Sequence, residues 1–237
     1  MIKDAIVLSG GFGKRLKSKI KDIPKPMAEV GGKPFLQIVL DHLLKNGLEN
    51  IILSVSYKKE VIKDYFGNRY KKLNIIYAEE TMPLGTGGAV RNSIDFTRCN
   101  DVFILNGDTF FDISLKQLFD FHLKKKADLS IALKKTVSGK TDRYGSVLLD
   151  SEKRIISFKE KTKDDFSYIN GGIYLMNINK FKKIKFPEKF SFEKDFLEQY
   201  LFEYKFYGKI FDSYFIDIGV PEDYETANKE LNKEYFK

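Results

Sequence analysis

The stretch "DAIVLSGGFGKRL", Asp4–Leu16, begins with an apolar run and passes directly into a segment with three glycines and two cations. The run "AIV" is typical of a buried strand. Glycines crowded at the end of a strand usually mean that something must approach the backbone closely. We therefore expect a strand whose carboxyl end faces a ligand, with Lys14 and Arg15 available to an anionic group.

Beyond this stretch, apolar runs that suit strands alternate with helical patterns. Strands are predicted at 50–56, 73–79, 101–108 and 127–135, and helices at 35–47, 59–68, 85–96 and 114–126. Repeated βα units with near-continuous apolar strands favour a parallel sheet that helices cover on both faces. His42 and His122 fall within two of these helices, where we expect surface or packing positions rather than ligands.

The pattern changes from Tyr144 onward. Residues 145–161 alternate like a hairpin, and 168–177 and 211–219 are predicted strands. The aromatic and basic segment 181–209 suits a helix with Phe and Tyr on its core face better than a nucleic-acid stacking surface. The simplest organisation is one α/β domain over 1–237, with a nucleotide-binding half (1–143) and a smaller mixed or antiparallel acceptor-binding half (144–237).

Composition narrows the function classes. Among 237 residues, 43% are hydrophobic and 31% charged, as expected for a soluble globular protein. One cysteine, Cys99, excludes an internal disulfide framework and a cysteine zinc cluster, and we assign it no role. No leader peptide or membrane span is apparent, so we expect a cytoplasmic protein. The net charge of +8 favours anionic partners, but the lysines are scattered, which favours a solvated surface over nucleic-acid binding.

Three explanations of the glycine loop compete. A Walker-type phosphate loop fails because Gly13-Lys14 is followed by Arg15 rather than Ser or Thr. A dinucleotide fingerprint is weak because Leu16 stands where its third glycine belongs. The remaining explanation is a loop at the carboxyl edge of an open sheet that closes around a phosphate or a base, with Arg15 as a planar cation. A plain turn with solvated cations is the structural alternative.

A second motif, "IPKPM" at Ile23–Met27, places Lys25 between two prolines. Prolines stiffen the backbone, which would hold the ammonium in one direction, as a phosphate-binding charge requires. A solvated loop lysine is an equally good explanation for this residue alone.

Together these two motifs resemble the signature of the sugar-1-phosphate nucleotidyltransferases, also called sugar-nucleotide pyrophosphorylases. The resemblance runs through most of the chain. The further pieces that carry it are "PLGTGGA" at 83–89, "NGD" at 106–108, "EK" at 160–161, "NGGIY" at 170–174 and "DIGVPEDY" at 217–224. The resemblance implies a Rossmann-like, mostly parallel sheet flanked by helices. It also implies that a sugar 1-phosphate attacks the α-phosphorus of an NTP and releases pyrophosphate.

The resemblance also assigns candidate residues. The catalytic candidates are Arg15, Lys25 and Asp108. The nucleotide-binding candidates are Leu8, Gly10, Gly11, Gly13, Arg15, Glu80, Gly85, Thr86, Gly107 and Asp108. The sugar-phosphate candidates are Gly145, Glu160, Lys161, Asn170 and Gly171.

Two carboxylates are candidate ligands for Mg²⁺. Asp108 ends an apolar strand, where an acid has little packing reason to be, and Asp217 opens another family motif. Magnesium in such sites takes one or two carboxylates plus phosphate oxygens. Each aspartate alone could instead begin a turn or cap a helix, but the pair favours a metal.

The sequence identifies the nucleotide base and the sugar less specifically than it identifies the family. By resemblance Glu80 lies in the segment that contacts the base, and a carboxylate accepts both the N1–H and the N2 amino group of guanine, which favours GTP. The form "E-x-x-PLGTGGA" is most similar to guanylyltransferases acting on D-glycero-α-D-manno-heptose 1-phosphate in surface polysaccharide biosynthesis. Mannose-1-phosphate guanylyltransferases, and glucose-1-phosphate thymidylyl-, uridylyl- or cytidylyltransferases, are the alternatives. We expect no C-terminal hexapeptide-repeat β-helix, which argues against a bifunctional acetyltransferase.

Three other classes are less favoured. A non-catalytic nucleotide-sugar-binding regulator would be expected to have lost one of the catalytic or metal candidates, and all are present. The incomplete glycine fingerprint counts against a nicotinamide oxidoreductase, and only the net charge supports a nucleic-acid binder. We expect no membrane partner, and the sequence leaves a homo-oligomer open.

Overall fold

The structure is a computed structural model that describes residues 2–11, 16, 20, 23–135, 144–160 and 168–231. Its strands are β1 (Asp4–Leu8), β2 (Glu29–Val30), β3 (Lys33–Pro34), β4 (Asn50–Val55), β5 (Arg69–Tyr70), β6 (Leu73–Glu79), β7 (Asp101–Asn106), β8 (Thr109–Phe111), β9 (Leu129–Lys135), β10 (Gly145–Leu149), β11 (Ile155–Glu160), β12 (Tyr168–Asn177), β13 (Phe206–Phe211) and β14 (Phe215–Asp217). Its α-helices are α1 (Phe35–Lys45), α2 (Lys59–Phe66), α3 (Gly85–Ser93), α4 (Leu115–Lys125), α5 (Ile178–Phe181) and α6 (Pro221–Glu230). Short turns of other helix types are η2 (Lys25–Met27), η3 (Ile94–Phe96) and the π-helical η4 (Phe192–Leu197).

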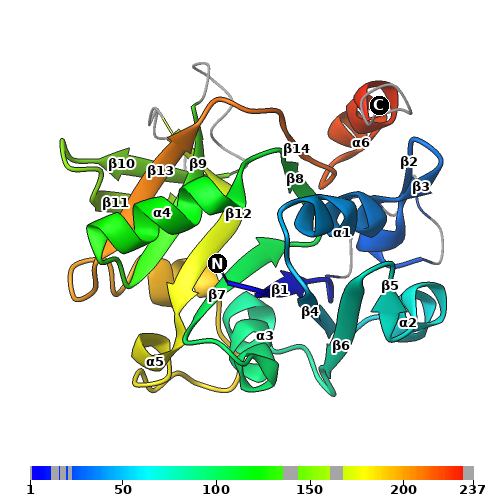
Figure 1. Ribbon diagram of the computed structural model, residues 1–237, viewed down its shortest axis with the longest axis horizontal. Helices are drawn as coiled ribbons and strands as arrows, with labels where there is room; N and C mark the ends of the chain where they lie inside the picture. The colour runs from blue at the N-terminus through cyan, green and yellow to red at the C-terminus, as the bar shows by residue number, and fades with distance from the viewer. Residues whose placement is uncertain are drawn as a thin grey trace.

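Four parallel strands form the centre of the sheet in the order β7-β1-β4-β6 (Figure 1). Ala5, Ile6 and Val7 of β1 are fully buried, because helices cover both faces of the strand. One apolar cluster joins the sheet to α1, α2 and α4, and a second joins it to α3, α5 and η4. The predicted parallel sheet with helices on both faces is confirmed.

The predicted mixed and antiparallel portion is also confirmed, and it continues the same sheet. Strand β12 pairs antiparallel with β7 along its second half and lies between β9 and β10 at its start. The hairpin β10–β11 forms as expected, and β13 adds to β9 in parallel. The register of β12 shifts between Asn170 and Tyr174, where Gly172 has a φ of +70° and donates its N–H to Asn170 Oδ1. Asn170 and Gly172, at this irregularity, both line the candidate site.

The prediction of one amphipathic helix over 181–209 is wrong. The segment leaves α5, passes Pro187, forms the π-helical turn η4 and enters β13. Pro187 interrupts a helical pattern because it has no backbone N–H to donate. The aromatic residues do reach the core, since Phe190, Phe192, Phe196 and Phe206 are buried, whereas Phe202 is 75% exposed. The predicted strand over 211–219 is likewise divided between the end of β13 and the short strand β14.

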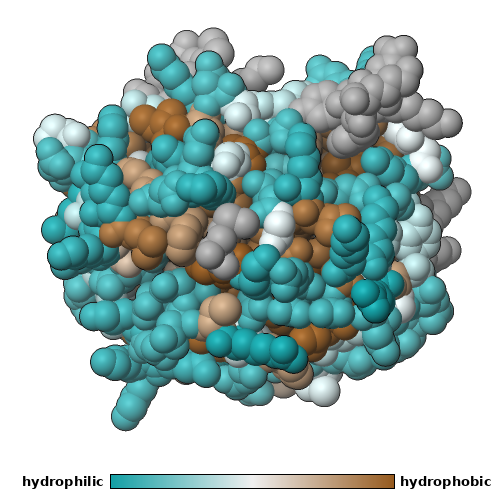
Figure 2. Space-filling view, in the orientation of Figure 1, coloured by the Kyte–Doolittle hydropathy of each residue, from teal (hydrophilic) through white to brown (hydrophobic). Residues whose placement is uncertain are grey.

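The surface in the view of Figure 1 is mainly hydrophilic, with apolar groups visible between the charged side chains (Figure 2). Within the described residues, no helix is both long enough and apolar enough to cross a lipid bilayer.

Both histidines are packing residues, as expected. His42 of α1 is 7% exposed, with Nδ1 at 3.5 Å from an Asp112 carboxylate oxygen and its ring edge-on to Phe110. Burial lowers the pKa of His42 to about 4, and Lys45 adds to this shift while Asp112 opposes it. His122 is 3% exposed, lies 2.9 Å from Ser130 Oγ through Nδ1, and has a pKa that burial also lowers.

The buried neutral His42 predicts a pH-dependent stability. Below its ordinary pKa of 6.5 the unfolded chain binds a proton that the folded chain does not bind until about pH 4, so the free energy of unfolding falls across this window. The loss attributable to His42 is about 2 kcal/mol between pH 7 and pH 5. Urea unfolding at these two pH values should show a smaller pH dependence for His42→Gln than for the wild type. An unchanged pH dependence would contradict this assignment, and His122→Gln reports the contribution of the other histidine.

Candidate active site

A cavity of about 390 Å³ lies at the carboxyl ends of the parallel strands, where ligands bind in open α/β sheets. Its wall is formed by residues of β1, β4, β7, β8, β10, β11, β12 and β14, of η2, α3, η4 and α6, and of the loops between these elements. The lining consists of Leu8, Gly10, Gly11, Lys25, Ser54, Glu80, Pro83, Gly85, Thr86, Ala89, Asn106, Asp108, Thr109, Tyr144, Gly145, Glu160, Asn170, Gly172, Glu193, Phe215, Asp217, Gly219, Val220 and Asp223.

Most of the predicted site residues meet in this cavity. Those that line it are Leu8, Gly10, Gly11, Lys25, Glu80, Gly85, Thr86, Asp108, Gly145, Glu160, Asn170 and Asp217. Gly107 and Gly171 do not line it. A Cβ on Gly107 would lie 2.7 Å from the Leu8 carbonyl oxygen, and one on Gly171 would lie 2.5 Å from the Phe111 ring, so both glycines serve close packing. Gly13, Arg15 and Lys161 lie outside the described residues.

The charged centre of the cavity is formed by Lys25, Asp108 and Asp217. The Lys25 ammonium donates to Asp108 Oδ2 at 2.5 Å and lies 3.5 Å from Asp217 Oδ1. The Lys25 side chain is 10% exposed, and those of Asp108 and Asp217 are 35% and 27% exposed. One cation thus lies between two partly exposed carboxylates that face the cavity.

Local backbone structure places each of these three groups. Pro24 is extended, and Lys25 begins the 3₁₀ turn η2 with Pro26, so the lysine backbone is held on both sides. Asp108 is the second residue after β7, and the antiparallel pair β8–β14 puts Asp217 opposite Thr109. The Ile218 N–H also donates to the Asp108 carbonyl oxygen at 3.0 Å. These backbone contacts bring together two carboxylates that are far apart in the sequence.

The close charges shift the acidities of all three groups. Burial lowers the pKa of Lys25, but Asp108 and Asp217 outweigh burial and the net pKa is raised. Burial raises the pKa of Asp108, but Lys25 outweighs it and the net pKa is lowered. Burial, with repulsion from Asp108, raises the pKa of Asp217 to about 6. Lys25 therefore carries its positive charge at neutral pH, and the two carboxylates share this one cation.

The donor set of this centre fits Mg²⁺. Two carboxylates that contact the same ammonium supply the number of protein ligands that this ion ordinarily takes, and phosphate oxygens of a substrate would add to them. Within the part of the chain that the structure describes, no group of three or more His, Cys, Asp and Glu side chains is arranged to hold a metal ion.

Glu80 lies at another part of the cavity wall in a fixed orientation. Its Oε2 accepts the Leu84 N–H at 3.0 Å, and its Oε1 accepts the Ser54 hydroxyl at 3.2 Å. Gly10 is close beneath it, since a Cβ there would lie 3.0 Å from Oε1. Burial raises the pKa of Glu80, although these two hydrogen bonds oppose the shift. A carboxylate oxygen has two acceptor positions, so each oxygen keeps one for a ligand.

Glu193 is an acidic cavity residue that the sequence analysis missed. It belongs to η4, and its Oε2 accepts the Thr86 hydroxyl at 2.7 Å and the Ser191 hydroxyl at 3.1 Å. The Thr86 hydroxyl in turn accepts the Phe192 N–H at 2.9 Å. A π-helical turn amid a helical pattern often marks a functional position, but the sequence gives no local signal for one here.

Three of the predicted sugar-phosphate residues, Gly145, Glu160 and Asn170, line the cavity. Asn170 is buried, and its amide donates to the Tyr174 hydroxyl at 2.7 Å. A Cβ on Gly145 would lie 2.8 Å from the Phe158 ring and 3.0 Å from Glu160 Oε2, so this glycine lets Glu160 approach β10 closely. Tyr144 and Phe215 also line the cavity with ring centroids 5.5 Å apart, and the sequence analysis did not select either residue.

Comparison with known proteins shows that this chain is similar in sequence to one family and to several of its members. Residues 4–234 match the nucleotidyl transferase family. The chain is 48% identical over 228 residues to a D-glycero-alpha-D-manno-heptose 1-phosphate guanylyltransferase of Aneurinibacillus thermoaerophilus, covering 96% of this chain and 98% of the relative. It is 36% identical over 232 residues to a mannose-1-phosphate guanylyltransferase of Mycobacterium tuberculosis, covering 96% of this chain and 64% of the relative.

A solved structure is also similar. The crystal structure of HddC from Yersinia pseudotuberculosis complexed with GMP-PN aligns with a TM-score of 0.84 and 36% identity, covering 97% of this chain and 100% of that one.

Proposed function

The chain belongs to the nucleotidyl transferase family, and we propose that it transfers the guanylyl group of GTP to D-glycero-α-D-manno-heptose 1-phosphate. An oxygen of the sugar phosphate forms a bond to the α-phosphorus of GTP. The bond from the α-phosphorus to the bridging oxygen of the β-phosphate breaks, and pyrophosphate leaves with that electron pair. The products are the GDP-sugar and pyrophosphate. We place this GTP-consuming reaction in the cytoplasm.

The observation that carries this proposal is the convergence of the Lys25–Asp108–Asp217 centre and Glu80 in one cavity. Both substrates are anions, so the reaction needs positive charge near the α-phosphorus and a fixed alignment of the two phosphates. The Lys25 ammonium is charged and held by two carboxylates, and would neutralise the α-phosphate or the incoming phosphate. Arg15, which lies outside the described residues, is proposed to stabilise the transition state.

Asp108 and Asp217 are proposed to hold Mg²⁺. When bound, this ion would supply positive charge to the phosphate oxygens of the two substrates. The carboxylates would also keep Lys25 oriented toward the cavity, because both contact its ammonium. On the acceptor side, Glu160 is proposed to accept a hydrogen bond from a sugar hydroxyl and Asn170 to donate one to another. Lys161 is proposed to contact the sugar phosphate.

The preference for guanine is proposed to reside in Glu80. Its two oxygens are held by Ser54 and the Leu84 backbone, so the carboxylate need not reorder when a base binds. Guanine presents two adjacent donors, N1–H and the N2 amino group, whereas uracil and thymine present one N–H. The relatives described as guanylyltransferases and the GMP-PN complex of HddC support this choice of base.

Replacing Glu80 by Gln tests the base assignment. An amide accepts through one oxygen only, so kcat/KM with GTP should fall about tenfold to a hundredfold, which corresponds to about 1–3 kcal/mol. With UTP, dTTP and ATP the same quantity should stay within about threefold of the wild type, because those bases do not use both oxygens. A coupled pyrophosphate-release assay with these four nucleotides and CTP measures both effects.

Glu79→Gln is the matched control. Glu79 precedes Glu80 but is exposed and paired with Lys59 at 2.6 Å and Lys63 at 2.9 Å. Its loss should leave the nucleotide preference unchanged. An unchanged preference in Glu80→Gln, or a wild type that prefers dTTP or CTP, would refute the guanine assignment while leaving nucleotidyl transfer intact.

Mannose 1-phosphate is the second candidate acceptor. The observation that favours it is the relative described as a mannose-1-phosphate guanylyltransferase, although this chain spans 64% of that relative's length. The same assay with heptose 1-phosphate, mannose 1-phosphate and glucose 1-phosphate decides between the acceptors by their kcat/KM values.

A further inference from the structure

Residues 186–190 lie directly against the beginning of α3. A Cβ on Gly85 would lie 2.5 Å from the Phe190 carbonyl oxygen, and a Cβ on Gly88 would lie 2.8 Å from the Glu188 carbonyl oxygen. A Cβ on Gly87 would overlap the Phe190 ring. The glycines of "GTGG" are therefore required by this packing, in addition to any contact with a ligand.

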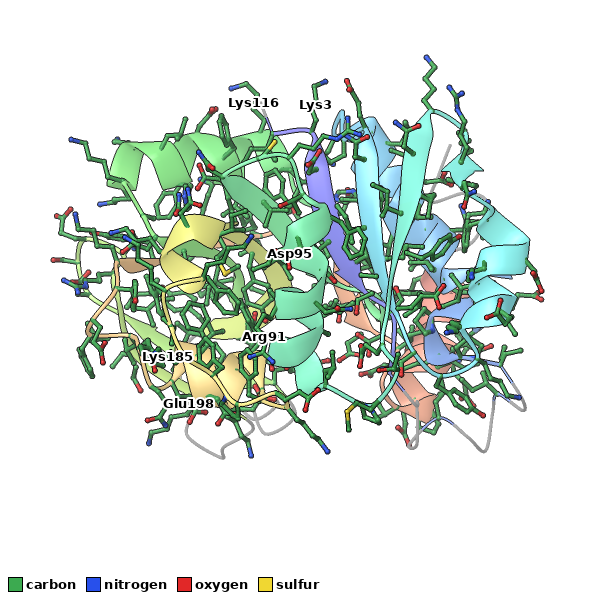
Figure 3. All side chains as sticks on the ribbon, turned by 90° about the horizontal axis from the view of Figure 1, so that it is seen from below. Lys3, Arg91, Asp95, Lys116, Lys185 and Glu198 are labelled. Atoms are coloured by element: carbon green, nitrogen blue, oxygen red, sulfur yellow. The ribbon has the colours of Figure 1, made fainter. Side chains whose placement is uncertain are left out.

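Arg91, one turn further along α3, binds the same segment. Its guanidinium donates from Nη1 to the carbonyl oxygens of Phe186 at 3.1 Å and Pro187 at 3.0 Å, and from Nη2 to that of Glu188 at 2.9 Å. Its Cζ lies 5.3 Å from the centroid of the Phe190 ring. Figure 3 shows Arg91 on the side of α3 that is turned toward the region of Lys185. Only a planar guanidinium satisfies three neighbouring carbonyls while it packs over a ring.

The same segment also fixes the cavity wall. The Gly87 N–H donates to the Phe190 carbonyl oxygen at 3.0 Å, and the Phe190 N–H donates to the Leu84 carbonyl oxygen at 3.0 Å. Just beyond the segment, Phe192 and Glu193 bond Thr86. Gly85 and Thr86 line the cavity, so their position depends on where residues 186–190 lie.

We propose that Arg91 is a positioning residue for the nucleotide: it holds residues 186–190 against α3 and thereby fixes Gly85 and Thr86 in the cavity wall. Arg91 is not among the residues that line the cavity, so it acts through the segment rather than on substrate. This inference rests on the proposed function, in which the wall formed by Gly85 and Thr86 receives the nucleotide.

Arg91→Ala tests the proposal by separating the two substrates. Releasing the segment should misplace the nucleotide wall, so KM for GTP is expected to rise about tenfold, while kcat and KM for the sugar phosphate stay within about threefold. Arg91→Lys keeps a donor without the planar fork, so its KM for GTP should lie between those of wild type and Arg91→Ala. Lys185→Ala is the matched control. Lys185 is exposed, and its substitution removes a positive charge beside the segment but leaves the hydrogen bonds of Arg91 to the carbonyls of Phe186, Pro187 and Glu188 in place.

A purely structural role would lower the folded fraction, and hence kcat, with both KM values unchanged; that result would overturn the proposal. Equal effects on the two KM values would overturn it as well. If Arg91→Ala does not fold, Arg91→Lys carries the test with the same selective rise. A wild type without GTP turnover would contradict the proposed function instead, and the Kd for GTP by calorimetry, which Arg91→Ala must weaken, would then decide the positioning role.

Discussion

Asp108→Asn is expected to lower kcat by about 10² to 10³, the scale of removing one preorganised charge from a reacting centre. The amide is nearly the same size as the carboxylate, so the fold should persist. The substitution removes the negative charge of the Asp108 carboxylate, which lies 2.5 Å from the Lys25 ammonium and is proposed to hold Mg²⁺. Raising the Mg²⁺ concentration should recover part of the activity, because Asp217 remains as a ligand and the site is weakened rather than removed.

The measurement is pyrophosphate release from GTP and heptose 1-phosphate across a Mg²⁺ titration. Asp212→Asn is the control, since Asp212 pairs with Lys134 at 3.1 Å and its side chain is 96% exposed. This variant should behave as the wild type at every Mg²⁺ concentration. Turnover by Asp108→Asn at the wild-type rate, or full wild-type activity in the presence of EDTA, would refute the proposed role of the carboxylate pair.

Lys25→Met is expected to reduce kcat by a similar factor of about 10² to 10³. Among the described residues that line the cavity, Lys25 is the only lysine or arginine. Without it, Asp108 and Asp217 lose their shared cation and repel the substrate phosphates more strongly. The free energy of unfolding should also fall, because Asp108 and Asp217 would then face each other without the cation that lies between them. Lys25→Arg keeps the charge and should retain more activity than Lys25→Met.

Lys3→Met provides the comparison for this variant. Lys3 pairs with Glu49 at 2.6 Å just before β1, at the opposite end of that strand from the cavity (Figure 3). Lys3→Met removes one positive charge, as Lys25→Met does, and should leave kcat unchanged. If Lys25→Met kept the kcat of the wild type, the ammonium would have no part in the reaction, whatever its effect on stability.

The longer elements in the first half of the fold were predictable because they are encoded locally, whereas the short strands β2, β3, β5 and β8 were not predicted. The strand 73–79 was predicted with its exact bounds, and the helices beginning at residues 35 and 85 begin there in the structure. Continuous apolar runs bury both faces of a central strand, and apolar residues at helical spacing bury one face of a helix, so a window of ten residues contains the signal. Family resemblance then selected Lys25, Asp108 and Asp217 without showing that they touch.

The segment 181–209 was not predictable in the same way. Its aromatic residues suit a core-facing helix, a strand or an irregular segment equally well. The choice depended on how Phe190, Phe192 and Phe196 pack against the sheet, and on Pro187. The position of Glu193 in the cavity follows from that packing. A pattern of hydrophobicity reports that residues are buried, but not which distant partners bury them.

The order of the main βα units, the edge of the sheet at which Gly10, Gly11 and Asp108 lie, and the family of the motifs could all be predicted from the sequence. The contacts that bring these residues together in one site became evident in the folded structure alone. The β8–β14 pair brings Asp217 to Asp108, and the close packing of residues 186–190 explains the glycines of α3. The two kinds of information differ in the separation of the residues that carry them along the chain. The hydrophobic pattern of a helix or strand lies within about ten neighbouring residues, whereas these ion pairs and close contacts form between segments that are far apart in the sequence.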